Sequence, residues 1–435
     1  MFKLPVTKKF ILVTIIVLTS FMVLLLLHVQ GYVTTFFWIY SILMTSFILT
    51  VHVITRSYRP VPDLGYRPTV SVIVPSKNEE DVIGRTVNSI LASDYPQDKI
   101  EIVVVNDGST DKTADVVRSI NSPRVTLLDF KVNRGKRWAF ASGVDASKNE
   151  IVICIDSDTL ADEQAIKLLV QPFIDKEVVS VCGHGKAANE NTNILTKLQH
   201  FWYQDMFRLI KGMESQLGAV SCCSGILAAY RRESILPVMS RWLNEKFFGR
   251  PILIGDDRQL TNLVLWKGLS TALSDETRKA KVVYQSNSIA MTFVPDRPKQ
   301  FFKQQLRWKR AWVHGSLLAG RFMWKKKFPI PLIFYMYQFL TYASPVIIIT
   351  AIIVTPLNGN VMATSLFLVG TFYVALLQGL SLWSFGYNVK AILYRILFVP
   401  LSFFMSMTVL LYAWSTPWKG GWVTRSEKNA KKQVA

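Results

Sequence analysis

Two strongly apolar blocks flank a central region in which polar and apolar residues alternate at short intervals. The N-terminal block holds the apolar runs 10–28 and 32–54, and the C-terminal block holds the runs 331–354 and 361–385. Each run has about the 20 residues that a helix needs to cross a bilayer. The charged residues concentrate between about 56 and 327. This pattern predicts a soluble domain inserted between two transmembrane hairpins.

Basic residues stand at the outer ends of both predicted hairpins, whereas the short connectors within them carry no charge. These flanking residues are Lys3, Lys8, Lys9, Arg56, Arg59, Arg67, Lys325, Lys326, Lys327, Lys390 and Arg395. Under the positive-inside rule we expect the central domain and both termini to be cytosolic, in a multi-pass protein of the plasma membrane. A cleaved signal peptide at 10–28 is the less favoured alternative, because that run is long and lacks a small-residue cleavage site.

The last apolar stretch, 396–414, differs from the others because basic residues flank it on both sides. Pro400 lies inside this stretch, and a proline removes a backbone donor and crowds the preceding helical turn. We therefore expect Pro400 to break a helix here. The pattern favours an interfacial or re-entrant segment rather than a full crossing.

The central region predicts an α/β fold. β-branched runs at 69–75, 100–106, 125–128 and 150–155 are typical of buried strands, and segments with helical spacing separate them. Such alternation predicts a mainly parallel sheet covered by helices. Ligands of these sheets bind outside the carboxyl ends of the strands. Two acidic turns, one at Asp107 and one at 156–158, follow predicted strands.

The formal net charge of +20 fits a cytosolic membrane surface or a polyphosphate substrate. A nucleic-acid partner is not expected, since no nucleic-acid-binding motif occurs. The 4 cysteines match no zinc-site spacing, so we expect reduced thiols.

The acidic turns carry the first candidate chemistry. Asp156 and Asp158 straddle one small residue, so both carboxylates can reach one Mg²⁺ or Mn²⁺ whose remaining positions are filled by phosphate and water. Asp107 is the candidate contact for a uridine, and Lys136 is a candidate cation for the nucleotide. The alternatives are a solvated acidic turn and ordinary surface charge.

Asp256 and Asp257 lie at a predicted helix start. Helix N-termini favour carboxylates, so capping is one interpretation. The other is a general base, which glycosyl transfer from an α-linked nucleotide sugar needs in order to deprotonate the acceptor hydroxyl. One base without a covalent intermediate gives inversion and a β-linkage.

A basic aromatic stretch contains Gln304, Gln305, Arg307 and Trp308. The planar fork of an arginine suits a diphosphate, and the flat face of a tryptophan suits a sugar ring. A membrane-surface helix with snorkelling cations is the alternative, and both descriptions can hold for different faces of one helix.

The ordered motifs around Asp107, 156–158, 255–257 and 304–308 resemble those of the processive family-two glycosyltransferases, a resemblance that covers about residues 69–425. Hyaluronan, chitin-oligosaccharide and cellulose synthases belong to that family. The resemblance implies a cytosolic domain of the GT-A type, interfacial helices and a channel that carries the polymer outward. The expected divisions are 1–55 (hairpin), 56–297 (GT-A domain), 298–330 (interfacial helices), 331–385 (hairpin) and 386–435 (interfacial segment with a switch loop).

Within the family the chain is most similar to the hyaluronan synthases. This similarity implies UDP-GlcNAc and UDP-GlcA as donors, a growing polysaccharide as acceptor, and a metal-dependent, inverting, processive reaction coupled to export. It also implies further substrate-binding residues: Cys223, Ser224, Gly225, Arg258, Trp422, Thr424 and Arg425. The alternatives are a β-glycan synthase with a single UDP-sugar, a non-processive transferase to a lipid carrier, and a non-catalytic membrane protein.

Overall fold

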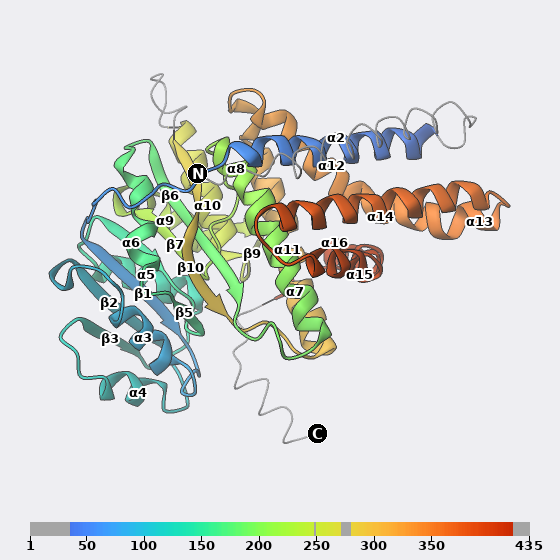
Figure 1. Cartoon of the computed structure of the whole chain (residues 1–435). Helices are drawn as coiled ribbons and strands as arrows, with labels where there is room; N and C mark the ends of the chain where they lie inside the picture. The colour runs from blue at the N-terminus through green and yellow to red at the C-terminus, as the bar shows by residue number, and fades with distance from the viewer. Residues whose placement is uncertain (1–34, 248, 271–279, 421–435) are drawn as a thin grey trace.

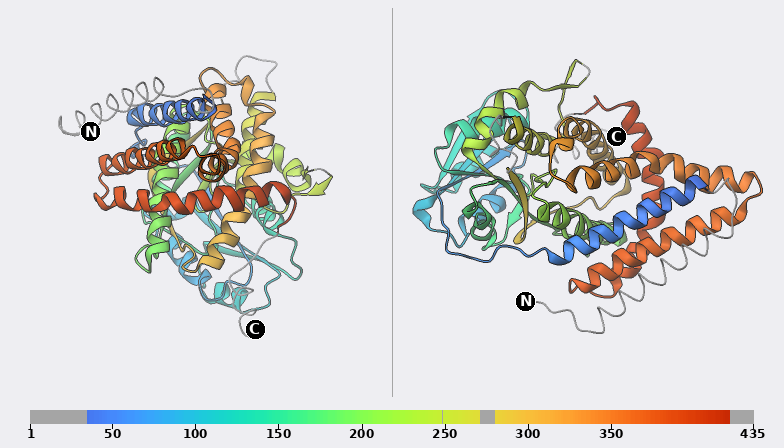
Figure 2. Two further views of the ribbon diagram at one scale, coloured as in Figure 1. Left: turned by 90° about the vertical axis from the view of Figure 1, so that its right-hand side faces the viewer. Right: turned by 90° about the horizontal axis from the view of Figure 1, so that it is seen from above.

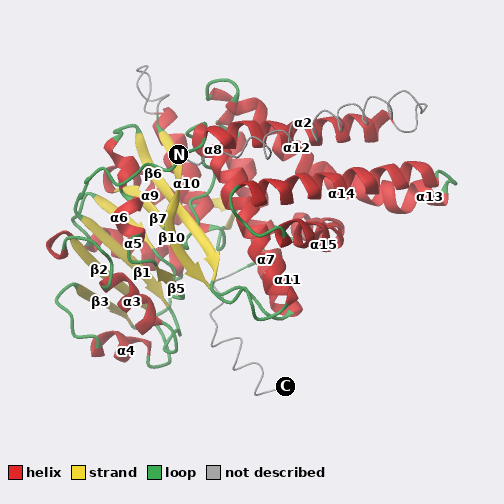
Figure 3. Cartoon of the chain, in the orientation of Figure 1, coloured by secondary structure: helices red, strands yellow, loops and turns green. Residues whose placement is uncertain are grey.

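The computed structural model describes residues 35–247, 249–270 and 280–420. The predicted run 10–28 lies outside these residues. Figure 1 shows a sheet with its covering helices on one side and long helices projecting from the other. The colouring of Figure 3 makes the division plain, because all strands lie in the first part. This separation of a sheet domain from long helices agrees with the predicted domain between membrane helices.

Eight strands form the main sheet, in the order β3-β2-β1-β4-β7-β6-β10-β5. The strands of this sheet are β1 (Val70–Ser76), β2 (Ile100–Asp107), β3 (Val125–Phe130), β4 (Ile151–Cys154), β5 (Thr159–Ala161), β6 (Val178–Ala187), β7 (Ala228–Arg231) and β10 (Lys281–Thr292). β8 (Lys246–Phe247) and β9 (Arg250–Pro251) form a separate hairpin.

The sheet is mainly parallel, as the sequence pattern predicts. β1 pairs in parallel with both β2 and β4, and every residue of β1 is buried. Burial on both faces explains the continuous β-branched runs, since parallel strands are covered from both sides. β7 and β5 run antiparallel to their neighbours.

The helices of the domain cover the sheet: α5 packs on β1 and β2, and α6 packs on β10. The helices are α3 (Ile83–Leu91), α4 (Thr113–Ser119), α5 (Lys136–Ala146), α6 (Ala165–Leu169), α7 (Ile194–Gln204), α8 (Gly212–Gln216), α9 (Arg232–Asn244), α10 (Asp256–Ser270) and α11 (Pro298–Gly320). A π-helical stretch, Asp205–Lys211, joins α7 to α8.

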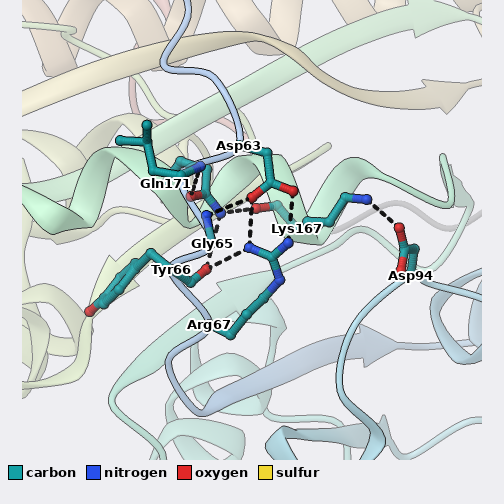
Figure 4. Close-up of polar contacts among 8 residues, drawn as sticks. Asp63, Gly65, Tyr66, Arg67, Asp94, Lys167 and Gln171 are labelled. Atoms are coloured by element: carbon teal, nitrogen blue, oxygen red, sulfur yellow. Dashed lines mark hydrogen bonds and ion pairs between the residues drawn. The ribbon is translucent and has the colours of Figure 1, made fainter.

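The segment between the first described helix, α2 (Thr35–Ser57), and β1 is fixed to the domain by polar contacts (Figure 4). Arg67 pairs with Asp63 at 2.7 Å. The side chain of Gln171 accepts a bond from the backbone of Leu64 and donates one to the carbonyl of Tyr66. The membrane helix and the sheet are thereby joined by an ordered strap.

Within the residues that the structure describes, four helices are long and apolar enough to cross a membrane. They are Ile39–Ser57, Ile330–Leu357, Val361–Ser384 and Lys390–Ser415. The second comprises α12 (Ile330–Ile349), a π-helical stretch and α13 (Thr355–Leu357), and the third is α14 (Val361–Ser384). α2 packs against α12 and α14, and Figure 2 shows the three side by side. This bundle contains the predicted hairpin 331–385.

The expected break at Pro400 is wrong. α15 (Lys390–Phe404) continues through Pro400 and, after a π-helical stretch at Met405–Leu410, ends as α16 (Leu411–Ser415). A proline is tolerated within an apolar bundle because neighbouring helices and local π-type turns satisfy the freed backbone groups. In Figure 1 this helix is seen nearly end-on, whereas α14 runs across the picture, so the two cross.

α11 lies between the sheet and the membrane helices (Figure 1). It packs against α10 of the domain and against α16 at the end of the chain's last long helix. The predicted interfacial segment 298–330 is therefore mostly one helix that touches both parts of the molecule.

Candidate active site

The turn between β4 and β5 carries Asp156 and Asp158. The backbone N–H of Asp156 donates to the carbonyl of Gly225 at 2.9 Å. A Cβ added to Gly225 would lie 2.9 Å from Asp156 Oδ1, so only glycine lets this loop approach the carboxylate. Asp156 and Asp158 are both partly exposed. The turn is therefore open on the side opposite the core, as a metal-diphosphate site requires.

A lysine already lies beside this turn. Lys136, the first residue of α5, places its Nζ 2.5 Å from Asp156 Oδ1. Burial opposes the charged lysine, but the negative charges of Asp156, Cys154 and Asp256 raise the pKa of Lys136 above its ordinary value. The structure thus brings a permanently charged ammonium to the carboxylate pair, as the sequence predicts for a nucleotide site.

The uridine contact of Asp107 stays a prediction, and the structure gives this carboxylate partners within the protein. Its side chain is fully buried, Oδ1 accepts the N–H of Arg134 at 2.8 Å, and Oδ2 accepts the N–H of Gly135 at 2.7 Å. Next to it, a Cβ on Gly108 would lie 2.6 Å from the backbone nitrogen of Asn133. Asp107 therefore holds the loop before α5 in place, and a direct contact with a uridine requires that loop to move.

The two carboxylates at the start of α10 have different partners. Asp256 Oδ1 accepts Nε of the buried Arg137 at 2.6 Å, and Arg137 also donates to the carbonyl of Trp242. Asp257 Oδ1 accepts the backbone N–H of Arg258 at 2.7 Å. Within the described residues the Asp257 carboxylate has no ion pair. Asp256 is therefore structural, and Asp257 is the better candidate base.

The candidate base stands on a turn that only glycine permits. Gly255 has a φ of 72°, and a Cβ there would lie 2.6 Å from the Cβ of Ala311 on α11. The turn before Asp257 is therefore seated directly on the helix that carries the motif at 304–308.

Residues from α5, the end of β4, the loop of Gly225 and the start of α10 surround one small volume. A pocket in the domain is lined by Lys136, Cys154, Gly225, Asp256 and Asp257, among others. Burial raises the pKa of the Cys154 thiol to about 12; the cation of Lys136 opposes this shift, and the charges of Asp156, Asp257 and Asp256 add to it. The metal-site carboxylate and the candidate base are thus neighbours around one thiol.

The motif on α11 contributes an aromatic wall. Trp308 stacks on Trp202 of α7 with ring centroids 6.0 Å apart, and it lies 6.1 Å from the ring of Tyr203. Burial raises the pKa of Tyr203, with Asp158 adding to the shift and Arg307 opposing it. Trp308 thus packs against Tyr203, on which both Asp158 and Arg307 act electrostatically. The predicted roles of Arg307 toward a diphosphate and of Trp308 toward a sugar ring stay predictions. Gln305 is buried and Gln304 is partly exposed.

The other predicted substrate-binding residues, Arg258, Cys223 and Ser224, differ in their contacts and burial. Arg258 donates to Ser221 Oγ at 3.3 Å, and its side chain lies over Gly315 of α11. Cys223 is fully buried, lies 3.2 Å from Ser180 Oγ and lines the pocket. Ser224 is partly exposed beside it. All 4 cysteines are free, as expected.

The chain returns to the site at its described end. Arg310 of α11 donates to Thr416 Oγ1 at 2.8 Å. A Cβ on Gly420 would lie 2.7 Å from Ile254 Cγ2, next to the turn that holds the candidate base. The predicted switch-loop residues Trp422, Thr424 and Arg425 lie outside the described residues.

Trp202 and Tyr203 were not predicted from the sequence. Their signal is the aromatic run 201–203, which interrupts an otherwise ordinary helix pattern. Aromatic residues are common in cores, so the run alone does not indicate a site.

Comparison with known proteins identifies the domain. Residues 71–236 match the model of the glycosyl transferase family 2. The chain is 32% identical to the hyaluronan synthase of Streptococcus pyogenes over 325 residues, which cover 73% of this chain and 74% of that protein. This chain belongs to glycosyl transferase family 2. It is also 33% identical over 258 residues to an N-acetylglucosaminyltransferase of Neorhizobium galegae, with 58% of this chain and 56% of that protein covered.

A solved structure supports the fold independently. The mannosyltransferase PcManGT of Pyrobaculum calidifontis, described in complex with GDP-Man and Mn²⁺, has a TM-score of 0.58 at 23% identity. The likeness covers 83% of this chain and 98% of that one. The protein is therefore a family 2 glycosyltransferase with a GT-A-like domain, flanked by helices apolar enough for a membrane.

Proposed function

We propose that this family 2 glycosyltransferase is a membrane-integrated, processive and inverting hyaluronan synthase that uses UDP-GlcNAc and UDP-GlcA. The identity to the streptococcal hyaluronan synthase carries the proposal. The 325 aligned residues exceed the length of the expected domain 56–297, so the likeness extends into the flanking helices. A relative that shares only the catalytic domain would not have this property.

In this proposal Asp257 is the general base that accepts the proton of the acceptor hydroxyl. Its partly exposed carboxylate, its place on the pocket wall and its freedom from an ion pair within the described residues support the role. Asp256 keeps the turn in place through Arg137.

Asp156 and Asp158 would hold Mg²⁺ or Mn²⁺. Two carboxylates on a tight turn fit a hard cation whose other ligands are diphosphate and water, and within the described residues no larger cluster of acidic, histidine or cysteine ligands occurs. When bound, the metal supplies positive charge to the departing diphosphate. Lys136 supplies a second positive charge at the same turn.

A cavity between the membrane helices supports processive transfer with export. It has a volume of about 250 Å³ and is lined by residues that include Trp202 and Tyr337. Trp202, which lines this cavity, stacks on Trp308 of the candidate site, and this contact supports the proposal. The growing polymer would pass from Trp308 into this cavity, in a protein whose catalytic domain and termini face the cytosol.

The C-terminal motif would close the nucleotide site. The motif is Trp422, Thr424 and Arg425, and the contact of Gly420 with Ile254, beside the turn of the candidate base, supports this role. Ending the chain after Gly421 should leave membrane insertion intact and abolish polymer synthesis. Polymer made at the normal rate by the truncated, folded protein would contradict this role.

A chitin-type synthase that uses UDP-GlcNAc alone is the second candidate, favoured by the N-acetylglucosaminyltransferase relatives. The chain spans 56% and 63% of the length of those two relatives. The deciding experiment supplies each donor alone and both together to the protein in vesicles. Polymer that needs both donors and is degraded by a hyaluronidase supports hyaluronan, whereas chitinase-sensitive oligomers from UDP-GlcNAc alone would replace it by the second candidate.

A further inference from the structure

A buried ion pair lies where the domain meets the membrane helices. Arg395 Nε is 2.7 Å from Asp205 Oδ2. Asp205 is 5% exposed and opens the π-helical stretch after α7, and Arg395 is 8% exposed on α15. Arg395 also donates to the side chain of Gln378 on α14. Three helices therefore meet at one guanidinium.

The pair is poorly satisfied. Among the described residues, both carboxylate oxygens of Asp205 and two nitrogens of Arg395, Nε and Nη1, are buried without a hydrogen bond of good geometry. Burial raises the pKa of Asp205 to about 6, although the charge of Arg395 opposes the shift. Replacing such a pair by apolar residues is often neutral for stability. Fold stability alone is thus a weak reason for charges here.

The pair faces the cavity rather than a closed core. Asp205 and Arg395 both line it, together with Trp202 and Tyr337. Trp202 stacks on Trp308 of the candidate site and also on Phe398 of α15 at 6.1 Å. The guanidinium and the ring of Trp202 therefore line the same cavity, one ring contact away from Trp308.

We propose that Arg395 is a docking cation for the uronate carboxylates of the growing polymer, and that Asp205 holds this guanidinium until a uronate replaces it. The inference rests on the proposed function, because it requires an anionic glycan. No covalent bond changes: one carboxylate leaves the guanidinium as another arrives.

The chemistry of the site favours this ligand. The planar fork of arginine binds carboxylates in a bidentate manner, and the present partner of Arg395 is itself a carboxylate. A polymer with a carboxylate on every second sugar presents such a group repeatedly, whereas a neutral glycan gives the guanidinium no anion to exchange for Asp205.

The test uses the full-length protein in vesicles of neutral phosphatidylcholine, so that no anionic lipid competes. Asp205→Leu with Arg395→Met removes both charges without leaving one unpaired. With both UDP-sugars we expect products about tenfold shorter than wild type, the loss of one charge-assisted contact. UDP release during transfer of the first sugars should fall much less than product length, and the melting temperature should remain near that of wild type.

Two further variants separate binding from structure. Asp205→Asn keeps the cation and should keep or increase product length. Arg67→Met removes a 2.7 Å but exposed pair with Asp63, and it should leave product length unchanged. Full-length polymer from the folded double variant would overturn the proposal, as would equal shortening by Asp205→Asn.

Reactions with UDP-GlcNAc alone and with both UDP-sugars distinguish a wrong role for Arg395 from a wrong proposed function. If wild type makes only UDP-GlcNAc oligomers, hyaluronan synthesis is wrong and the uronate role falls with it. If wild type makes hyaluronan and the double variant makes it at full length, the proposed function stands and only the role of Arg395 is wrong.

Discussion

Two acidic turns at the carboxyl edge of the same sheet differ in what surrounds their carboxylates. The turn after β2 buries Asp107 completely and fills both oxygens with backbone N–H groups. The turn after β4 leaves Asp156 partly exposed, with the ammonium of Lys136 beside it. The strands before both turns look alike in sequence, yet one carboxylate organises a loop and the other stays partly exposed beside a lysine.

The difference comes from what folds over each turn. After β3 the chain passes beside β2, and the backbone of residues 132–135 lies over Gly108 and Asp107. Over the β4 turn lies the loop that contains Gly225, which has no side chain and leaves the carboxylate accessible. A carboxylate already bonded by the protein's own N–H groups has little capacity left for a ligand. The adjacent pair Asp256 and Asp257 repeats this contrast.

The largest effect should come from Asp257→Asn, which keeps the shape of the side chain and removes its ability to accept a proton. We expect turnover to fall at least about a hundredfold, the low end for loss of a general base, with UDP binding retained. UDP release and UDP affinity in membranes measure the two effects.

Asp256→Asn is the matched control, because its carboxylate is already paired with Arg137. It should lower the melting temperature and cost less turnover than Asp257→Asn. If Asp256→Asn loses more turnover than Asp257→Asn, and Asp257→Asn has the lower melting temperature, the assignment of Asp257 as the base is wrong. If Asp257→Asn instead loses UDP affinity, Asp257 belongs to the nucleotide site.

Asp158→Ala should remove most of the dependence on divalent ions. We expect turnover at saturating Mg²⁺ or Mn²⁺ to fall at least about tenfold, because one hard oxygen ligand is lost. A metal titration of UDP release provides the measurement. Normal metal-dependent turnover in this variant would defeat the assignment of the turn after β4.

Gly225→Ala tests whether access to that turn matters. The added methyl group would lie 2.9 Å from Asp156 Oδ1 and must displace either the loop or the carboxylate. We expect weaker metal binding and a severalfold loss of turnover, with less effect on folding. Gly370→Ala is the comparison variant, since nothing lies within 4 Å of its added Cβ and its φ is not in the left-handed region. Equal behaviour of the two variants would argue against a crowded Gly225.

Asp107→Asn should have the smallest effect on chemistry and a clear effect on stability. One backbone N–H loses an acceptor, and such a loss costs about 1–3 kcal/mol. We expect a lower melting temperature with less than about a threefold change in kcat once the protein is folded. A large rise in KM for the UDP-sugar, without a change in stability, would restore Asp107 as a uridine contact.

Much of the fold follows from the sequence, because strands that are buried on both faces appear as continuous apolar, β-branched runs. The run 100–106 is apolar and β-branched, and β2 (Ile100–Asp107) forms there. The turn 156–158 was predictable because it directly follows such a strand. The partner of each carboxylate was not predictable, since Arg137 and Asp256 are 119 positions apart and meet only through tertiary packing.

The cavity was missed for a similar reason. Arg395 looks like a membrane-flanking cation in sequence, and Asp205 looks like an ordinary helix residue. Their meeting depends on the packing of α15 against α7 and the π-helical stretch that follows it. Contacts between distant helices decide such cases, and no local pattern encodes them.

The close packing of Gly255 on Ala311 has a mechanical consequence. Because backbone and methyl group touch without an intervening side chain, the first turn of α10 and the middle of α11 cannot slide independently. Trp308 lies one turn from Ala311 on the same helix. The distance between the candidate base Asp257 and Trp308 is thus fixed by this contact between α10 and α11. If the product advances by one sugar, the product itself or side chains must move, because the spacing of α10 and α11 stays constant.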